Sequence, residues 1–390
     1  MSPSLRFPEF TGEWEKCKLG TLATKVGSGS TPKGGDAVYT SIGHYFVRSQ
    51  NVGMGFLMLD NIAHINDDIH QKHKATEIYE NDVLLNITGA SIGRTAVATK
   101  ELEGGNVNQH VCIIRTNSKV NPKFLCDYIQ TQRIQNHIKS LQTGGSREGL
   151  NFEQIRSFPI SLPSINEQNK LTCLLDKINE RIATQVRLIE DLKKLRCAIV
   201  EKMFKQSKAN GRLGDFIEQV SVRNKNGLYS NVLSVSNKQG FVKQSEQFED
   251  RTVASEDTSN YKIVKRNNFA YNPARINVGS IARLTKFDVG IVSPMYVCFR
   301  TKASIIPEYM EAFFTSQQFF YEMMKRLEGS VRLCLSYEGL CNIPVYIADM
   351  NKQIAMGQNI SLILSKIGLE IEYLGRLHQQ KQYLLRKMFI

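Results

Sequence analysis

The chain has 390 residues, 42% hydrophobic and 22% charged, and its 50 basic and 37 acidic side chains give a formal net charge of +13. The length allows two or three domains, and the absence of both a ~20-residue apolar run and a secretory signal predicts a cytoplasmic globular protein. The basic excess favours a polyanionic partner such as nucleic acid, because Lys and Arg bound to phosphates release counterions, although a solvated basic surface would look the same.

Residues 1–163 predict a first globular part with mixed α/β structure. Apolar runs such as DVLLNIT and HVCIIRT predict strands, because β-branched residues fit a half-buried sheet. Asn121 and Pro122 predict the start of an amphipathic helix, since the missing N–H of proline costs nothing in the first turn. Glycine-bearing loops carry the candidates for DNA contact, which are Lys33, Arg48, Gln50, Asn51, Ser91, Arg94, Gln109 and Arg147.

Residues 164–206 predict one long amphipathic helix. Its seam positions alternate by four and three residues, which is the spacing of a coiled coil. Two late positions of the seam, Lys193 and Arg196, are polar. The seam runs through Leu175, Asn179, Ile182, Val186, Ile189, Lys193, Arg196, Val200 and Met203.

Residues 207–348 and 349–390 predict the same order again, a globular part followed by a long helix. The strand-like runs NNFAYN and GIVSPMYVCFR precede a helix that starts at Ile306 and Pro307. The candidates for DNA contact here are Arg223, Lys225, Asn272, Arg275, Asn277 and Arg332. The seam of the last helix runs through Ile360, Leu364, Ile367, Ile371, Leu374, His378, Lys381, Leu385 and Met388.

The two halves of the chain form an internal repeat. A shift of 185 residues carries Lys202-Met203-Phe204 onto Lys387-Met388-Phe389, and upstream matches drift to 194, as loops of different length would cause. The repeating unit is too long for a solenoid. We therefore predict two α/β (α+β) domains and two long helices that pack as a coiled coil. Further matches pair LNFEQIRSFPI with LSYEGLCNIPV, VCIIRT with VCFRT, and LLNITGASIG with AYNPARINVG.

Neither metal nor disulfide chemistry is predicted. The stretch HINDDIHQKH contains His64, His70 and His73, but the spacing is loose for metal ligands and nothing elsewhere completes a site. A polar surface loop is therefore the favoured interpretation of this stretch. The eight cysteines include no C-x-x-C pair and predict reduced thiols.

One motif raises the question of catalysis. Asn272-Pro273-Ala274-Arg275 resembles the N-P-P-aromatic loop of amino-group DNA methyltransferases, which holds the amino group of a flipped base. Arg275 stands at the aromatic position, and the sequence has no F-x-G-x-G loop for a methyl donor. It also has no Walker A motif, nucleophile–histidine pattern or dinucleotide-binding fingerprint. We predict no catalytic, cofactor-binding or metal-binding residue in this chain.

The remaining polar chemistry favours recognition. Arg pairs bidentately with guanine edges and Asn or Gln with adenine edges, while backbone N–H groups and hydroxyls suit phosphates. Each candidate taken alone has the simpler interpretation of a solvated loop side chain. The set as a whole favours DNA contact more than any single member does.

The whole chain resembles the DNA-specificity subunit of type I restriction–modification enzymes. The resemblance is carried by LRFPEFTGEWEKCKLG, NITGASIGRTAVA, NVNQHVCIIRT and YNPARINVGSIARL, and by the paired helices that open on NEQ or NKQ and close on KMF. It implies that residues 1–163 and 207–348 are target recognition domains. It also implies that the helices at 164–206 and 349–390 form an antiparallel coiled coil with pseudo-two-fold symmetry.

The same resemblance implies a non-catalytic, DNA-reading function. Such a subunit reads a bipartite double-stranded DNA site, with a spacer set by the helix pair, on behalf of two methyltransferase subunits and of restriction and translocase subunits. The methyltransferases modify adenine N6, and S-adenosylmethionine, ATP and Mg are expected on the partner subunits only. Two alternatives stay open: a coiled-coil adaptor without sequence-specific DNA binding, and a lone adenine methyltransferase that uses the Asn272–Arg275 motif.

Overall fold

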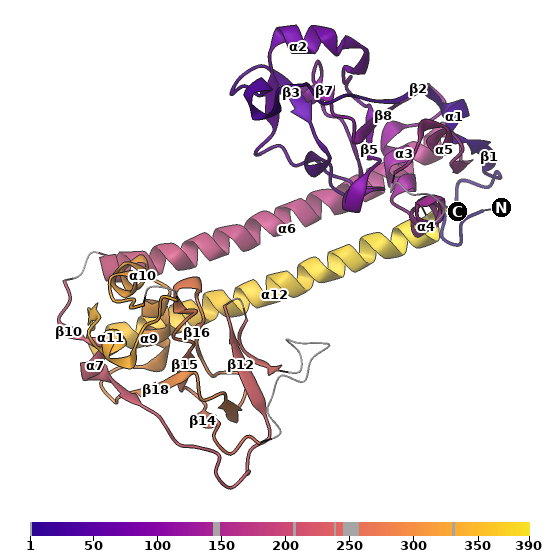
Figure 1. Ribbon diagram of the computed structural model, residues 1–390. Helices are drawn as coiled ribbons and strands as arrows, with labels where there is room; N and C mark the ends of the chain where they lie inside the picture. The colour runs from indigo at the N-terminus through magenta and orange to yellow at the C-terminus, as the bar shows by residue number, and fades with distance from the viewer. Residues whose placement is uncertain (1, 143–148, 206–207, 238, 245–256, 330–331) are drawn as a thin grey trace. The chain divides into compact units, whose positions relative to one another are not determined.

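The computed structural model describes residues 2–142, 149–205, 208–237, 239–244, 257–329 and 332–390. They form two compact units. The first unit comprises Met1–Thr184 and Tyr373–Ile390, and the second comprises Gln185–Glu372. Each unit contains one globular part and a piece of both long helices (Figure 1). Within the described ranges, no helix is long and apolar enough to cross a bilayer.

The described residues of the first unit contain three small sheets. Strands β1 (Glu15–Lys18) and β9 (Pro159–Leu162) pair antiparallel. A four-stranded sheet has the order β2 (Ala23–Ser28), β8 (Val111–Thr116), β5 (Val83–Asn86), β6 (Thr95–Val97). A three-stranded sheet has the order β4 (Ala63–Ile65), β3 (His44–Val47), β7 (Asn106–Val107), and its β7 runs parallel to β3. The apolar runs predicted as strands are therefore strands.

Short helices cover these sheets. They are α1 (Leu19–Leu22), α2 (Asp67–Lys72), α3 (Pro122–Ile129), α4 (Gln132–Gln142) and α5 (Phe152–Arg156). Helix α3 starts where the sequence predicts, because Asn121 Oδ1 accepts the Lys123 N–H at 2.9 Å and Pro122 occupies the first turn. Phe124, Leu125 and Tyr128 of α3 are buried in the main core of the unit.

The second unit repeats this arrangement. Strands β10 (Gly211–Arg212) and β19 (Pro344–Val345) pair, and one four-stranded sheet has the order β11 (Ile217–Gln219), β18 (Val297–Thr301), β15 (Phe269–Tyr271), β16 (Ile281–Arg283). The other sheet has the order β13 (Gly240–Lys243), β12 (Val232–Ser236), β17 (Val289–Val292), β14 (Lys262–Lys265). The helices are α7 (Leu213–Phe216), α9 (Pro307–Phe314), α10 (Gln317–Met324) and α11 (Tyr337–Cys341).

The two globular parts match in strand order, except that β14 has no counterpart among the described strands of the first unit. Order β11-β18-β15-β16 corresponds to β2-β8-β5-β6, and β12 pairs with an antiparallel β13 and a parallel β17, as β3 pairs with β4 and β7. The internal repeat predicted from sequence is therefore a repeat of fold.

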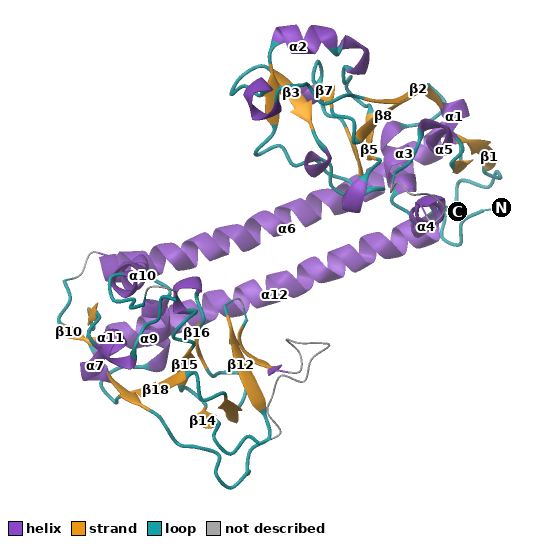
Figure 2. Cartoon of the chain, viewed as in Figure 1, coloured by secondary structure: helices purple, strands orange, loops and turns teal. Residues whose placement is uncertain are grey.

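The long helices are α6 (Ile165–Lys205) and α12 (Met350–Met388), and each is one continuous helix (Figure 2). In the first unit, Leu175 near the start of α6 shares a core with Leu385 near the end of α12. In the second unit, Val200 near the end of α6 shares a core with Met356 near the start of α12. Within each unit the two helices are thus antiparallel, which confirms the predicted pairing.

The predicted seam is wrong at three positions in the middle of each helix and correct again after them, where Val200 and Leu385 are buried. Leu175, Ile182, Ile189, Ile360 and Ile367 face inward as predicted. The inward positions between them are shifted by one residue: they are Ile178, Gln185 and Leu192 instead of Asn179, Val186 and Lys193, and Ile363, Glu370 and Leu377 instead of Leu364, Ile371 and His378.

The shift has a local cause. Gln185 Nε2 donates to the carbonyl oxygen of Glu370 at 3.2 Å and also to its carboxylate, and both side chains are buried. Ile371 is left 52% exposed beside this polar pair. A seam predicted from apolar residues alone includes Ile371 and misses the hydrogen-bonded pair Gln185 and Glu370.

Candidate nucleic-acid interface

Four loops of the first unit meet beside the carboxyl ends of β2, β3, β5 and β7. They are residues 29–34, 48–51, 87–94 and 108–110, which we call the first loop cluster. Main-chain bonds join them: Gly29 N donates to Asn108 O at 3.2 Å, Asn108 N to Val47 O at 3.0 Å, and Ile87 N to His110 O at 3.0 Å. The sheet registers bring these strand ends together, because β2 and β5 both run antiparallel to β8.

Side chains also hold the first loop cluster in shape. Asn86, fully buried at the end of β5, donates Nδ2 to Ser49 O at 2.8 Å. Gln109 Oε1 accepts the Thr31 N–H at 3.0 Å. Gln109 is exposed, and so is Lys33, which lies in the same 29–34 loop as Thr31. The structure therefore brings Lys33 and Gln109, which lie far apart in sequence, into one cluster.

Arg48 is the most constrained cation of the first loop cluster. Its guanidinium lies over the ring of Tyr39, 5.4 Å from the centroid, and its Nε is buried without a hydrogen-bond partner in the described residues. Asn51 is buried and bonds the backbone at both ends of its side chain: Oδ1 accepts the Arg48 N–H at 3.0 Å and Nδ2 donates to Met58 O at 2.9 Å. These bonds give the Asn51 side chain a part in shaping the loop.

The other first-unit candidates are placed as follows. Gln50 and Arg94 are exposed and Ser91 is half-buried at the end of η4 (Gly89–Ser91). Arg94 O accepts from Asn86 N at 2.8 Å, which anchors the exposed side chain at the base of the loop. Arg147 lies outside the described residues.

The second unit has an equivalent second loop cluster, residues 236–237, 272–280 and 293–296. Ser280 Oγ donates to Val235 O at 3.1 Å, and Val235 N donates to the hydroxyl of Tyr296 at 3.3 Å. Gly279 has a φ of +90°, and Gly93, its match in the repeat, has +86°. Both loops need glycine at this position, because the left-handed region is costly for other residues. The same loop geometry is therefore built twice.

Both oxygens of the Asn272–Arg275 motif that a methyltransferase loop would use already accept a hydrogen bond within the protein. Asn272 is buried and its Oδ1 already accepts the Ala274 N–H at 3.1 Å. Pro273 O accepts the Leu335 N–H at 3.1 Å. Both oxygens that would receive a base amino group are engaged within the protein, while Arg275 is exposed and forms no ion pair with a described residue.

The remaining second-unit candidates lie on neighbouring segments. Asn277 is half-buried in η6 (Ile276–Val278), inside the second loop cluster. Arg223 and Lys225 are exposed in a loop joined to the cluster side of β14 by the bond from Asn224 N to Tyr261 O at 2.9 Å. Arg332 is exposed and precedes Leu335, whose bond to Pro273 ties that segment to the motif loop.

Sequence reasoning missed several residues of this region. Tyr39 under Arg48, and Tyr261 and Tyr296 beside Arg275, are aromatic and lie outside the polar loops that the sequence singled out. The repeat carries a usable signal for one of them, because Tyr296 stands where His110 stands in the first half. Both residues immediately precede the strand that runs beside the cluster, β18 or β8.

The charge of both clusters is one-sided. Lys33, Arg48, Arg94 and Arg275 are basic, and neither loop cluster contains an Asp or a Glu. A surface with uncompensated cations and many exposed amides, hydroxyls and backbone N–H groups suits the phosphates and base edges of a nucleic acid. The geometry therefore supports one polyanion-binding face in each unit.

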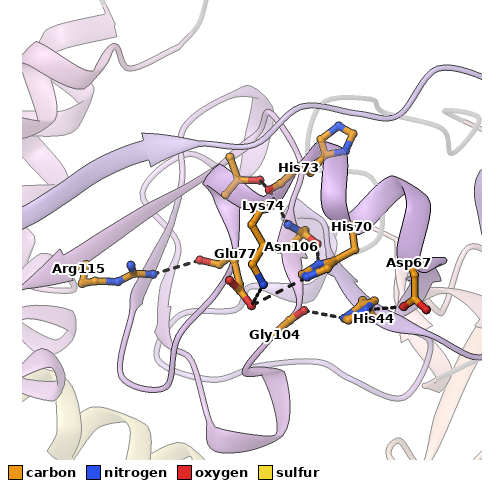
Figure 3. A network of polar contacts seen from close by, with 10 residues as sticks. His44, Asp67, His70, His73, Lys74, Glu77, Gly104, Asn106 and Arg115 are labelled. Atoms are coloured by element: carbon orange, nitrogen blue, oxygen red, sulfur yellow. Dashed lines mark hydrogen bonds and ion pairs between the residues drawn. The ribbon is translucent and has the colours of Figure 1, made fainter.

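The histidine-rich segment is not a polar surface loop. It forms β4 and α2, with Asn66 Oδ1 capping α2 by accepting the Ile69 N–H at 3.0 Å. His70 is buried, stacks on His44 with 3.8 Å between centroids, and donates Nδ1 to Asn106 Oδ1 at 2.7 Å (Figure 3). Across the described ranges, no group of three or more potential metal ligands occurs.

This network supports the strand that leads into Arg48. His44 begins β3, and its two ring nitrogens lie 2.9 Å from Gly104 O and 2.8 Å from Asp67 Oδ1 (Figure 3). Asn106 of β7 donates Nδ2 to His73 O at 2.9 Å. The histidines thus fix α2 and β7 to β3, and their role is structural.

Known proteins resemble this chain in sequence and in fold. Residues 11–194 match the family described as type I restriction modification DNA specificity domain. The type I restriction enzyme EcoBI specificity subunit of Escherichia coli is 24% identical over 135 residues, which are 34% of this chain and 28% of that protein.

Two solved structures share the fold. The type I restriction–modification S subunit from M. genitalium has a TM-score of 0.61 and 17% identity, with 100% of this chain and 99% of that chain covered. A structure described under complex assembly and conformational transition of the type I R-M system has a TM-score of 0.56 and 15% identity, with 98% of each chain covered. At these identities the likeness concerns the fold.

Proposed function

We propose that this chain is a DNA-specificity subunit of a type I restriction–modification system and that its two globular parts each read one half of a split DNA site. The observation that carries the proposal is the loop cluster built twice, once in each unit, with basic and amide side chains and no carboxylate. Residues 1–163 and 207–348 are the proposed target recognition domains.

Exposed and half-buried side chains of the clusters are the proposed DNA contacts. Arg275 and Arg48 are suited to guanine edges, and Gln50 and Gln109 to adenine edges. Lys33, Ser91, Arg94 and Asn277 are suited to phosphate or base contact from the same loops. Arg223, Lys225 and Arg332 would extend the contact along the flanks of the second cluster.

The helix pair is the proposed ruler of the site. Helices α6 and α12 are long, unbroken and antiparallel within each unit, and we propose that they keep the two recognition domains at a constant separation. A rigid separation of two readers translates into a fixed number of unread base pairs between the half-sites. We propose that the helices at 164–206 and 349–390 set this spacer.

The proposed partners supply the chemistry. The specificity subunit is itself non-catalytic in this family, and the engaged oxygens of Asn272 and Pro273 argue against methyl transfer by this chain. Two methyltransferase subunits would bind S-adenosylmethionine and methylate adenine N6, and restriction and translocase subunits would use ATP and Mg. Double-stranded DNA as target implies a cytoplasmic place of action.

The test is to co-express this chain with the methyltransferase encoded beside it and to sequence methyladenine in the host DNA. We expect methylation confined to one split motif with a constant gap. A soluble complex that methylates without any motif would overturn the proposal in favour of an adaptor without sequence-specific binding. Methylation by this chain without its partner would favour the lone methyltransferase.

A further inference from the structure

A cavity of about 280 Å³ lies in the second unit beside the second loop cluster. Its lining comes from β12, from the residue after β13, from the residue before β14 and from all three segments of the cluster. Tyr261, Tyr296 and Val235 contribute aromatic and apolar surface, and Asn272, Ser280 and Gln244 contribute polar atoms. Both tyrosines and Asn272 are largely buried.

Part of this polar lining has no partner among the residues that the structure describes. Gln244 Oε1 is buried and accepts no hydrogen bond from any described residue. The Tyr296 hydroxyl accepts the Val235 N–H at 3.3 Å, which leaves its own proton for another acceptor. Arg275 carries the one charge among the described lining residues. The cavity therefore offers an acceptor, several donors and a cation to whatever enters it.

The shape of the surface limits what the cavity can take from DNA. Base edges in a duplex lie below the rims of the grooves, so a protein reads them with side chains that project. A concave site accepts a group that projects from the DNA, which is either a backbone phosphate or a base swung out of the stack.

The chemistry of the lining decides between these two groups. A phosphate carries at least one full negative charge and is held by several cations or N–H donors. Here one arginine is the single cation, and the other described lining residues are tyrosine, leucine, valine, methionine, serine, asparagine and glutamine. The orphaned Gln244 oxygen is an acceptor that would repel an anion. Aromatic walls with a few hydrogen-bonding groups are what an extruded base needs.

We propose that this cavity receives one nucleobase of the target DNA, swung out of the duplex by the second recognition domain. The inference rests on the proposed function, and it assigns the Asn272–Arg275 loop a binding role without chemistry. Guanine fits the lining best. Arg275 can pair with its adjacent O6 and N7 acceptors, and Gln244 Oε1 can accept its N1–H or its amino group.

The experiment uses the full chain in complex with its methyltransferase and duplexes that carry the motif found by methyladenine sequencing. At each base pair of the half-site read by the second domain, the base on one strand is replaced so that its opposite base is mispaired. Extrusion costs a few kcal/mol for a paired base and least for a mispaired one. We expect a mispaired guanine at one position to bind about tenfold more tightly than the paired duplex.

Two variants and one control separate the cavity from the rest of the domain. Ser234→Met fills the cavity from β12, and Gln244→Met removes the orphaned acceptor while keeping the length of the side chain. Both are expected to lose the mispair gain and to bind the paired motif more weakly than the wild type, because the extruded base loses its site. Gln239→Met, an exposed position outside the lining, is expected to keep the gain.

Each outcome has one meaning. Binding of the motif by the wild-type complex with no gain at any mispaired position overturns the cavity assignment and leaves the proposed function intact. Failure of the wild-type complex to prefer the motif overturns the proposed function itself. A gain that persists in Gln244→Met overturns the cavity assignment. Titration with guanosine 5′-monophosphate tests whether the cavity binds a free nucleotide. Binding of this nucleotide without any mispair gain would overturn the proposal that the base comes from DNA.

Discussion

Single residues of the loop clusters divide into those the protein uses and those it leaves free. Asn51 and Asn272 have their side chains bonded to nearby backbone N–H groups, whereas Arg48 and Arg275 form no ion pair with a described residue. A carboxamide that hydrogen-bonds the backbone of its own loop stabilises the shape of that loop, whereas a guanidinium without an ion pair is available to a ligand. The free cations therefore carry the strongest expectation of base contact.

Replacing one free arginine should relax one half of the site. Arg275→Ala should weaken binding to the motif by about 1–3 kcal/mol and relax a base in the half read by the second domain, with Arg48→Ala doing the same in the other half. Competition binding against single-base variants of the motif measures both effects. Arg266→Ala is the matched control, because Arg266 is occupied by Asp288 and Thr285. Unchanged specificity in both variants would contradict the assignment.

A buried carboxylate at the start of α6 anchors the N-terminal segment. Glu167 accepts Arg6 Nε and Nη2, each at 2.7 Å, and Trp14 Nε1 at 3.2 Å. Glu167→Ala leaves both donors without an acceptor and should lower the free energy of unfolding by about 2–4 kcal/mol in chemical denaturation. The control is Lys170→Ala, which breaks an exposed ion pair with Glu9 and should cost below about 1 kcal/mol. Equal effects would show that the Glu167 contacts are not stabilising.

Asp127 makes the stability of the first unit depend on pH. Burial raises the pKa of Asp127 to about 7, against the opposing charge of Lys381. Because the folded pKa lies above the unfolded value of 3.8, the stabilising effect of protonation is complete below about pH 4 and is lost as the pH rises towards 7. The contribution of Asp127 should therefore make the wild type less stable at pH 8 than at pH 5.

The variant Asp127→Asn should remove that pH dependence. It keeps an oxygen for the bond that Gln130 Nε2 donates at 3.2 Å. At pH 8 it should be more stable than the wild type by up to about 4 kcal/mol, and at pH 4 the two should be nearly equal. Urea denaturation at the two pH values measures the difference. A gap that is the same at both values would contradict the assignment.

At the scale of elements, the two long helices combine apolar and polar layers. Gln185 and Glu370, which the repeat places at equivalent positions, contact each other directly in the second unit. Lys381 of α12 is buried and donates Nζ to Gln130 Oε1 of the first globular part at 3.0 Å. Lys193 and His378 are exposed, so of the four polar positions in the predicted seams only Arg196 and Lys381 face inward.

The buried lysine should matter more than the exposed one. Lys381→Met leaves the buried Gln130 oxygen without its donor and should lower the free energy of unfolding by about 1–3 kcal/mol. Lys193→Met is the same substitution at an exposed position and should stay within about 0.5 kcal/mol of wild type. Guanidinium denaturation of the two variants gives the comparison. Similar effects in both variants would show that the Lys381–Gln130 bond does not stabilise the packing of α12 on the first globular part.

At the scale of the molecule, one chain contributes both long helices to both compact units. Helix α6 leaves the first unit and enters the second, and α12 does the reverse, so each core closes only after distant segments meet. In the first core Trp14, Phe124 and Phe389 pack their rings together although they come from the start, the middle and the end of the chain.

Lengthening both helices should lengthen the unread gap of the site. One added heptad after Leu188 and one after Tyr373, its match in the repeat, preserve the seam and add about 10 Å. At ~3.4 Å per base pair this is about three base pairs. Methyladenine sequencing should show the same half-sites with the longer gap. An insertion in α6 alone misaligns the two seams and should abolish motif-specific methylation, and an unchanged gap in the double insertion would refute the ruler.

Much of this architecture could be predicted from sequence. The repeat, the α/β globular parts, the two long helices and the starts of α3 and α9 follow from local patterns: matching motifs, β-branched runs, a 3.5-residue period and proline in a first turn. The family resemblance rests on the same motifs. These patterns can be read from the sequence because each depends on residues that are close together in the chain.

Only the tertiary structure decided which side chains are used and where. Glu370 faces inward and Ile371 outward because Gln185 of the other helix bonds Glu370. His70 is buried because His44 and Asn106 satisfy it, and Tyr296 lines a cavity because β12 lies beside its hydroxyl. Each partner is distant in sequence, so the periodicity of one segment cannot reveal it. Sequence determined the elements and their repetition, and contacts between remote segments determined the seam, the roles of the polar residues and the cavity.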